Sequence, residues 1–194
     1  MGRCVGGDGM NTVSPIRDME MVKRVKREAQ QMGEQPYLMV LLGLNTGLRV
    51  SDLLQVRVSD ILGRGYILRR EKKTGKHAEV RFHAGVVSEM RRLLAGKRGD
   101  ELLFQSPKRY AKRDQPVDRN TAYSWVVTAC RRAGITEPVG CHTLRKTYGY
   151  HFYQQYRDIA TLMLKFNHSS EKETMRYIGI TQEHINSKTE RFRL

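Results

Sequence analysis

The stretch "CHTLRKTYGYHFY" at residues 141–153 decides the fold, because it is an evident helix with two polar residues in its opening turn. Leu144, Tyr148 and Phe152 recur every four residues and predict a buried stripe. His142 and Arg145 lie three positions apart, so on a helix they share another face. The pattern raises the question of what an imidazole and a guanidinium bind together beside a core.

Helical patterns extend outward from this stretch over most of the chain. The sequence predicts helices at residues 15–32, 36–47, 84–96, 118–134 and 157–166. It also predicts a short helix after Arg49 with Ser51 as its N-cap, and a helix that carries Tyr177 and starts at a Ser170–Glu173 capping box. A last polar helix is expected in the tail. The extended runs at 65–71 and 78–83 flank Thr74 and Gly75 and predict a β-hairpin. The expected fold class is therefore mainly α with a small β-hairpin: a flexible leader at 1–14, one domain at 15–180 and a tail at 181–194.

Charge is the strongest signal in the composition. The chain of 194 residues holds 35 Lys and Arg against 20 Asp and Glu, a net charge of +15. The basic residues cluster, as in "KRVKRE" at 23–28, "RRLLAGKR" at 91–98 and "KRYAKR" at 108–113. Such a surface attracts a polyanion, and nucleic acid is the first candidate. The basic segments do not form a separate amphipathic helix, which disfavours an anionic membrane as the partner.

The rest of the composition excludes several classes of protein. No apolar run approaches the length of a membrane span, and the first residues have no apolar signal-peptide region. Cys4, Cys130 and Cys141 are an odd number without the spacing of metal ligands, so reduced thiols in a cytoplasmic protein are expected. We expect no cofactor, no metal, no small-molecule substrate and no membrane partner.

Six polar residues at helix ends or turns are candidates for chemistry. They are Arg49, Lys73, His142, Arg145, His168 and Tyr177. Each alone has an ordinary structural interpretation, such as a charge at a helix end or a core tyrosine. Together they stand in "NTGLRVSDLL", the hairpin "KKTGK", "HTLR" and "NHSSEKETMRYIGI", in that order. This set resembles the tyrosine recombinases, the family of phage integrases and Xer-type resolvases, and is most similar to integrases of Gram-positive phages and mobile elements.

The resemblance covers residues 35–180 and implies site-specific DNA recombination without metal or ATP. A tyrosine of this family attacks DNA, leaving a 3′-phosphotyrosine and a free 5′-hydroxyl. By resemblance Tyr177 is this nucleophile, while Arg49 and Arg145 clamp the non-bridging oxygens of the transition state and His168 adds a donor. Lys73 would protonate the leaving 5′-oxygen, His142 would handle the proton of Tyr177, and Asp52 would support the arginines.

The resemblance also implies partners and a location. The expected partner is double-stranded DNA, on which relatives act as tetramers that exchange C-terminal segments. The expected location is the cytoplasm, in association with the nucleoid.

Two departures from the family pattern stand out. Many relatives have Leu-Gly before the second histidine, where this chain has Phe166 and Asn167; asparagine tolerates left-handed geometry, so we expect the turn to survive. Full-length members also carry a core-binding domain ahead of the catalytic one, and the residues before 36 are too few for it. A fragment, a short natural form or an accessory protein is then implied.

Two other function classes stay open at this stage. The first is a DNA-binding regulator on a recombinase scaffold, which would need the charge but not the tyrosine. The second is an RNA-binding helical protein, which has only the charge in its favour, because no aromatic RNA-binding strand is present.

Overall fold

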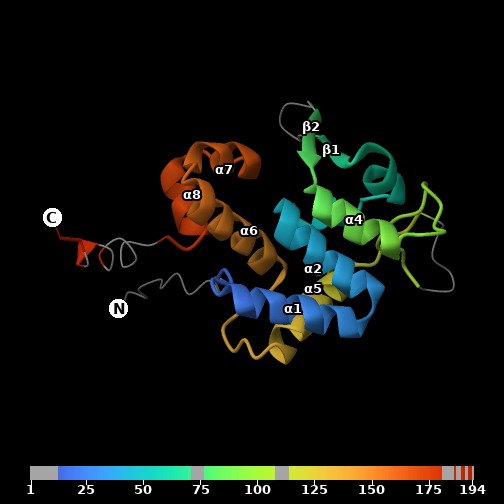
Figure 1. Ribbon diagram of the computed structural model, residues 1–194, viewed down its shortest axis with the longest axis horizontal. Helices are drawn as coiled ribbons and strands as arrows, with labels where there is room; N and C mark the ends of the chain where they lie inside the picture. The colour runs from blue at the N-terminus through green and yellow to red at the C-terminus, as the bar shows by residue number, and fades with distance from the viewer. Residues whose placement is uncertain are drawn as a thin grey trace, which may run out of the picture.

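Figure 1 shows a computed structural model, which describes residues 13–70, 77–107 and 114–180 and a few positions beyond 180. Its helices are α1 (Met19–Met32), α2 (Glu34–Thr46), α3 (Val50–Leu53), α4 (Ala84–Leu93), α5 (Arg119–Arg132), α6 (Cys141–Tyr156), α7 (Ile159–Phe166) and α8 (Glu171–Tyr177), with one π-helical turn η1 (Asp60–Arg64). Two antiparallel strands, β1 (Tyr66–Arg70) and β2 (His77–Arg81), form the sheet. The predicted fold class, mainly α with a small β-hairpin, is confirmed.

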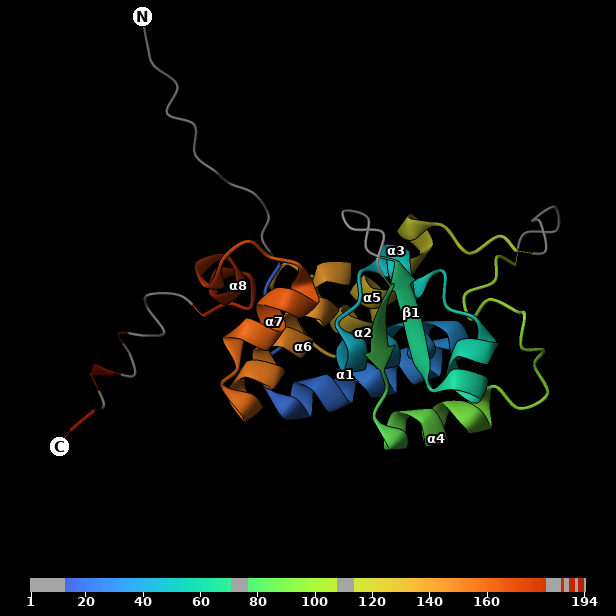
Figure 2. The ribbon, with the colours of Figure 1, turned by 90° about the horizontal axis from the view of Figure 1, so that it is seen from above.

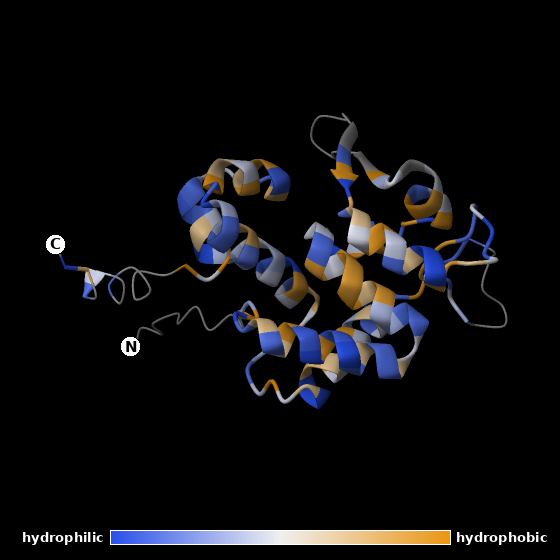
Figure 3. Cartoon of the chain, viewed as in Figure 1, coloured by the Kyte–Doolittle hydropathy of each residue, from blue (hydrophilic) through white to orange (hydrophobic). Residues whose placement is uncertain are grey.

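Helix α2 is the centre of the larger core. Its sequence is apolar almost all round, which is typical of a helix that neighbours cover on every side. The structure buries nine of its residues, and α1, α4, α5 and α6 pack against it. Figure 3 shows this contrast, since α1 alternates between polar and apolar faces while α2 is more uniformly apolar. The core therefore lies around α2, with the charged faces of the outer helices turned to solvent.

The helices begin where short polar side chains can cap them. Asp18, Asp118, Asp158 and Ser170 each accept a hydrogen bond from a backbone N–H in the first turn of α1, α5, α7 and α8. The prediction for Ser51 is wrong. Arg49 is the N-cap of α3, so Ser51 already lies inside the helix and its hydroxyl faces the Asp52 carboxylate at 3.5 Å.

The hairpin pairs Ile67 with Val80, and both side chains are buried. Tyr66 pairs with Arg81, and the arginine lies over the tyrosine ring at 5.8 Å. Successive residues of a strand point to opposite faces, so Ile67 and Val80 share the face of the hairpin that packs against the rest of the domain. The predicted turn at Thr74 and Gly75 and the candidate Lys73 lie outside the described residues.

A smaller core lies at the other end of the molecule. It contains the buried side chains Leu162 and Phe166 of α7, and Ile178 and Ile180 just after α8. Figures 1 and 2 both place α7 and α8 beside the far end of α6, away from α4 and the hairpin. Helix α6 is therefore the element that joins the two cores.

The buried surface of α6 differs from the predicted stripe. Leu144 is 2% exposed, whereas Tyr148 and Phe152 are only partly buried and pack against the smaller core. The first turns of α6 are instead buried on several sides, including the charged residues Arg145 and Lys146. The prediction was too narrow, because a helix that crosses between two cores is covered on more than one face.

Gly149 allows α6 to approach the smaller core. A Cβ at this position would lie 2.6 Å from Ile178 and 2.8 Å from Phe166. We expect Gly149→Ala to destabilise the protein by about 1–3 kcal/mol, because both neighbours are fully buried and would have to shift within the smaller core. Urea unfolding measures this effect. Gly63→Ala is the control, since its Cβ would meet nothing within 4 Å; an equal loss in both variants would contradict the packing argument.

The boundaries of the domain stay predictions. Most of the residues in 181–194 lie outside the described part of the chain, and so does the proposed exchange of this tail between protomers. Within the described residues, the helices are all too short or too polar to cross a membrane.

Candidate active site

Arg145 is the most deeply buried cation of the candidate site. It comes from the second turn of α6 and is 3% exposed. Its guanidinium donates to the backbone oxygens of Gly47 and Phe166, the latter at 3.2 Å, and lies 4.1 Å above the Phe166 ring. One side chain thus joins the loop after α2 to the end of α7, and the planar fork of arginine suits this bridging role.

Gly47 sets the position of Arg49. Its φ of +62° is left-handed, and it ends α2 as the sequence predicts. A Cβ there would also lie 2.5 Å from the Tyr148 ring. The chain then turns so that Arg49 is extended at the start of α3 and its side chain is only half-buried.

A pocket of about 230 Å³ lies where these elements meet. Arg49, His142 and Arg145 line it together with Arg119. Three guanidinium groups and one imidazole around a small pocket make an anion site, because they offer many hydrogen-bond donors and positive charge. The volume is enough for a phosphate group.

Tyr177 lies next to this anion site. Its hydroxyl is 3.0 Å from Nδ1 of His142, and the two rings meet edge-on. His142 stands in the exposed first turn of α6, whereas Tyr177 is the last residue of α8, so tertiary packing brings together residues 35 positions apart. This pair places a phenolic hydroxyl within hydrogen-bond distance of an imidazole, an arrangement in which the imidazole can take the proton of the hydroxyl.

His168 also lies next to Tyr177. Its ring centre is 5.0 Å from that of Tyr177 and 5.5 Å from that of Phe166. Its Nδ1 is hydrogen-bonded to the hydroxyl of Thr174 at 3.1 Å, which fixes the ring orientation. The histidine therefore packs against both the Phe166 and the Tyr177 rings.

The turn between α7 and α8 brings Tyr177 back toward α6. Asn167 adopts a left-handed conformation with φ of +54°, which confirms the expectation from its short polar side chain. Ser170 then caps α8 as predicted, but Glu173 accepts from the backbone and side chain of Ser169 rather than closing the box on Ser170. The cap therefore extends one residue further back than the sequence pattern suggested.

Burial and charge have opposite effects on the pKa of Tyr177. Burial raises the pKa of its hydroxyl, while the charge of Arg145, its hydrogen bond and the charge of Arg49 lower it. Burial has the larger effect, so the tyrosine keeps its proton at neutral pH. A base must then accept that proton before the oxygen can act as a nucleophile.

The two histidines have lowered pKa values. Burial is the largest cause for both; for His142 the charges of Arg145, Lys146 and Arg49 act in the same direction. For His168 the Glu173 carboxylate partly opposes the shift. Both imidazoles are therefore neutral at pH 7, and His142 can accept a proton.

Comparison with known proteins identifies the family. The model of the phage integrase family matches residues 19–184, which is most of the chain. The chain belongs to the phage integrase family. The resemblance seen in the sequence is thus confirmed.

Curated members of the phage integrase family are similar over most of this chain. A probable integrase/recombinase of Bacillus subtilis, YoeC, is 36% identical over 90% of this chain and 93% of its own length. The tyrosine recombinase XerA of Pyrococcus furiosus is 29% identical over 81% of this chain. The matched region is only 54% of the length of that relative. The chain is thus similar in length to one relative and much shorter than another.

Solved structures confirm the fold of this integrase-family chain. The crystal structure of XerA recombinase superposes with a TM-score of 0.69 at 23% identity, over 94% of this chain and 68% of that one. XerH recombinase in a post-cleavage complex with its difH substrate superposes with a TM-score of 0.70 at 19% identity, over 94% of this chain and 53% of that one. The catalytic domain of bacteriophage HP1 integrase superposes with a TM-score of 0.62 at 24% identity, over 92% of this chain and 95% of that one.

The structure of this integrase-family chain gathers five of the six candidates. Arg49, His142 and Arg145 share the pocket, Tyr177 contacts His142 at its edge, and His168 packs on Tyr177. Lys73 lies outside the described residues, so its role stays a prediction. Asp52 stands on α3, three residues beyond Arg49, and its support of the arginines also stays a prediction.

Two residues at the site were missed by the sequence analysis. Arg119 is the first residue of α5 and lines the pocket, and Lys146 lies with its Nζ 5.2 Å from the centre of the Tyr177 ring. An arginine in a helix's first turn is unfavourable with the helix dipole, and this signal could have marked Arg119 as functional. Lys146 gave no such signal among the many lysines of the chain.

The lowered pKa values predict a pH dependence of stability. The folded histidines, His142 and His168, bind protons less readily than they do in the unfolded chain, whose ordinary pKa is about 6.5. Unfolding therefore takes up protons below that pH, so the contribution of the two histidines to stability is constant above about pH 6.5 and falls as the pH drops from there toward their folded pKa values. Urea midpoints at about pH 5.5 and about pH 7.5 measure this. A His142→Asn/His168→Asn variant should show a smaller difference; an undiminished one would contradict the assignment.

Proposed function

We propose that this chain is a site-specific tyrosine recombinase that cuts and rejoins DNA through Tyr177. The observation that carries the proposal is the 3.0 Å contact between the Tyr177 hydroxyl and Nδ1 of His142 beside a pocket lined by Arg49 and Arg145. A protein that only bound DNA would need the positive charge but would have no use for a nucleophile facing a neutral imidazole. The accessory-protein alternative is therefore not retained.

The proposed reaction follows from the positions of these groups. The Tyr177 oxygen attacks the phosphorus of a DNA phosphate and passes its proton to His142, whose lowered pKa leaves it unprotonated. The bond from phosphorus to the 5′-oxygen breaks, and that oxygen takes up a proton, for which Lys73 is the proposed donor. The resulting 3′-phosphotyrosine keeps the bond energy, so attack by a 5′-hydroxyl reverses the step.

The arginines would act on the phosphate during this step. The phosphorus passes through a five-coordinate state with extra negative charge on its non-bridging oxygens. Arg49 and Arg145 would donate to these oxygens from fixed positions, because Arg145 is already held by two backbone carbonyls. Preorganised donors of this kind lower the barrier without rearranging, and each is worth about 10²–10³ in rate. We propose the same role for His168.

The relatives support the proposed partner and context. XerH is described as bound to its difH substrate, and lambda integrase as bound to DNA and as a tetramer bound to a Holliday junction. We propose that this chain likewise binds duplex DNA and self-associates on it, with integration or excision of a phage or mobile element as the outcome. Such a protein would act in the cytoplasm at the nucleoid, where the DNA of a prokaryotic cell lies.

The test is incubation with a nicked suicide DNA substrate. Cleavage near the nick releases a short piece of DNA, religation fails and the covalent protein–DNA adduct accumulates. Denaturing gel electrophoresis with labelled DNA detects the adduct, and mass spectrometry of the attached peptide locates it. Adduct formation at Tyr177 supports the proposal. The absence of an adduct on substrates that a full-length relative cleaves would overturn it.

DNA binding is expected to depend steeply on salt. With a net charge of +15, the chain should contact at least ~6 phosphates, so its affinity should fall by about 10³-fold between 50 and 200 mM salt. Fluorescence anisotropy with a labelled duplex over a salt series measures the slope. Binding should also be modest and weakly selective for sequence; a flat salt response would contradict the electrostatic basis of the interaction.

A further inference from the structure

An extended segment ahead of α1 lies across α6. Residues 13–17, here called the strap, precede the first helix. Three hydrogen bonds connect the strap with α6. Lys146 Nζ donates to the Val13 carbonyl at 2.8 Å, the Ile16 N–H donates to the Thr147 hydroxyl at 2.9 Å, and His151 Nε2 lies 2.9 Å from the Ile16 carbonyl. Ile16 and Thr147 are buried. The strap is therefore docked on the helix that supplies His142 and Arg145.

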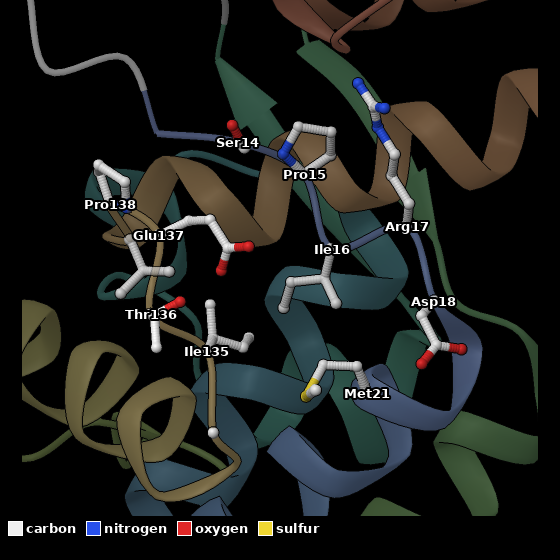
Figure 4. Close-up of a pocket in the computed structure, with 12 residues that line it drawn as sticks. Ser14, Pro15, Ile16, Arg17, Asp18, Met21, Ile135, Thr136, Glu137 and Pro138 are labelled. Atoms are coloured by element: carbon white, nitrogen blue, oxygen red, sulfur yellow. The ribbon is translucent and has the colours of Figure 1, made fainter.

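The strap also reaches the chain just after the nucleophile. Arg17 Nη2 donates to the Gly179 carbonyl at 2.9 Å, two residues beyond Tyr177. Pro15 packs there as well, since a Cβ on Gly179 would lie 3.1 Å from the proline ring. Figure 4 shows Arg17 among the residues that line a pocket with Ile16 and Ile135, with its guanidinium end turned away from Ile135. One short segment thus contacts both α6 and the end of α8.

Lys146 connects the strap to the ring of Tyr177. Its ammonium holds the Val13 carbonyl on one side and lies 5.2 Å from the centre of the Tyr177 ring on the other. The side chain is 9% exposed, and burial lowers its pKa. A desolvated cation is strongly attracted to the face of an aromatic ring. The contact therefore favours the position in which Tyr177 faces His142.

We propose that the strap holds α8 in its docked position and that Lys146 is the positioning residue that links the strap to Tyr177. Helix α8 is only seven residues long, so contacts at its end weigh heavily in deciding where Tyr177 lies. Displacing residues 13–17 would release Lys146 and Gly179 together. The position of the nucleophile is then controlled by a segment that is more than 130 residues earlier in the sequence and adjacent in space. The effect on catalysis rests on the proposed function, whereas the docking of α8 does not.

Variants of both strap contacts test this proposal. Lys146→Met keeps the aliphatic stem and removes the ammonium, Lys146→Arg keeps a cation, and Arg17→Ala removes the bond to Gly179. Lys165→Met is the matched control, because Lys165 lies 4.9 Å from the ring of a different tyrosine, Tyr148, in the same core. Arg17 is exposed, so its variant gives a result even where Lys146→Met fails to fold.

Two measurements decide the outcome. Hydrogen exchange of residues 171–179 without DNA reports docking, and the rate of adduct formation at saturating DNA reports the chemistry. We expect faster exchange and adduct formation slowed by about ten- to a hundredfold in Lys146→Met and Arg17→Ala, with DNA affinity unchanged, since misplacement of a reacting group has effects of this size. Lys146→Arg should restore most of the rate, and Lys165→Met should match the wild type.

The two readouts separate failure of this proposal from failure of the proposed function. Unchanged hydrogen exchange in both Lys146→Met and Arg17→Ala would overturn the claim that the strap holds α8, whatever the rate of adduct formation. Faster exchange with an unchanged adduct rate would overturn the positioning role of Lys146. A wild-type protein that forms no adduct at all would overturn the recombinase proposal, while the exchange data would still decide whether the strap holds α8.

Discussion

Replacing Tyr177 with phenylalanine is expected to abolish the covalent DNA adduct. The substitution removes the attacking oxygen and leaves the ring, which packs against Phe166 and His168. Little else should change, because among the described residues the hydroxyl contacts only two polar side chains, the exposed His142 and Arg145, and Arg145 keeps its bonds to two backbone carbonyls. DNA affinity should therefore stay within about twofold of the wild type. The nicked suicide substrate measures the first effect, and fluorescence anisotropy measures the second.

Tyr156→Phe is the matched control for this experiment. Tyr156 ends α6 and is 59% exposed, so its hydroxyl is not part of the site. This variant should form the adduct at the wild-type rate. A Tyr177→Phe protein that still forms the adduct would show that another group is the nucleophile and would remove the basis for the assigned roles.

Replacing Arg145 with alanine is expected to damage both the fold and the reaction. The guanidinium satisfies the Gly47 and Phe166 carbonyls in a buried position, so its loss leaves two acceptors without a donor. A loss of about 2–4 kcal/mol in the free energy of unfolding follows from the cost of such groups. Adduct formation should fall by at least about 10²–10³, the value of one preorganised donor. Urea unfolding and the suicide substrate measure the two effects.

Arg49→Ala separates the two contributions. Arg49 is half-buried and extended at the start of α3, so its removal should cost a similar factor in rate but less than about 1 kcal/mol in stability, as for surface substitutions. Equal destabilisation in the two variants would contradict the view that Arg145 has a structural role that Arg49 lacks.

Much of the site could be predicted because its residues stand at fixed distances along the chain. The nine positions from His168 to Tyr177 contain a capped turn and a short helix, and such local geometry is legible in sequence. Lys146 was missed for the opposite reason. Its burial depends on a strap 133 residues earlier in the chain, and no local pattern reports so distant a contact.

The fold shows the same division between local and distant information. Asn167 ends α7 and Ser170 begins α8, as their local backbone and capping preferences predict. The Ser51 prediction failed because serine is a good N-cap wherever the chain turns, and here the turn occurs two residues earlier. The predicted stripe of Leu144, Tyr148 and Phe152 assumed that α6 buries one face. The smaller core covers a second face of α6, and only the tertiary structure shows this.

The buried guanidinium of Arg145 has a consequence for how this protein can evolve. Tyr177 can become phenylalanine without opening the smaller core, whereas Arg145 cannot be lost without exposing the two carbonyls that it satisfies. A descendant that stops cutting DNA is therefore expected to discard the tyrosine early and to keep the arginine for as long as the domain folds. Among homologous sequences, an arginine at this position without the tyrosine would mark a lineage that has given up the reaction and kept the scaffold.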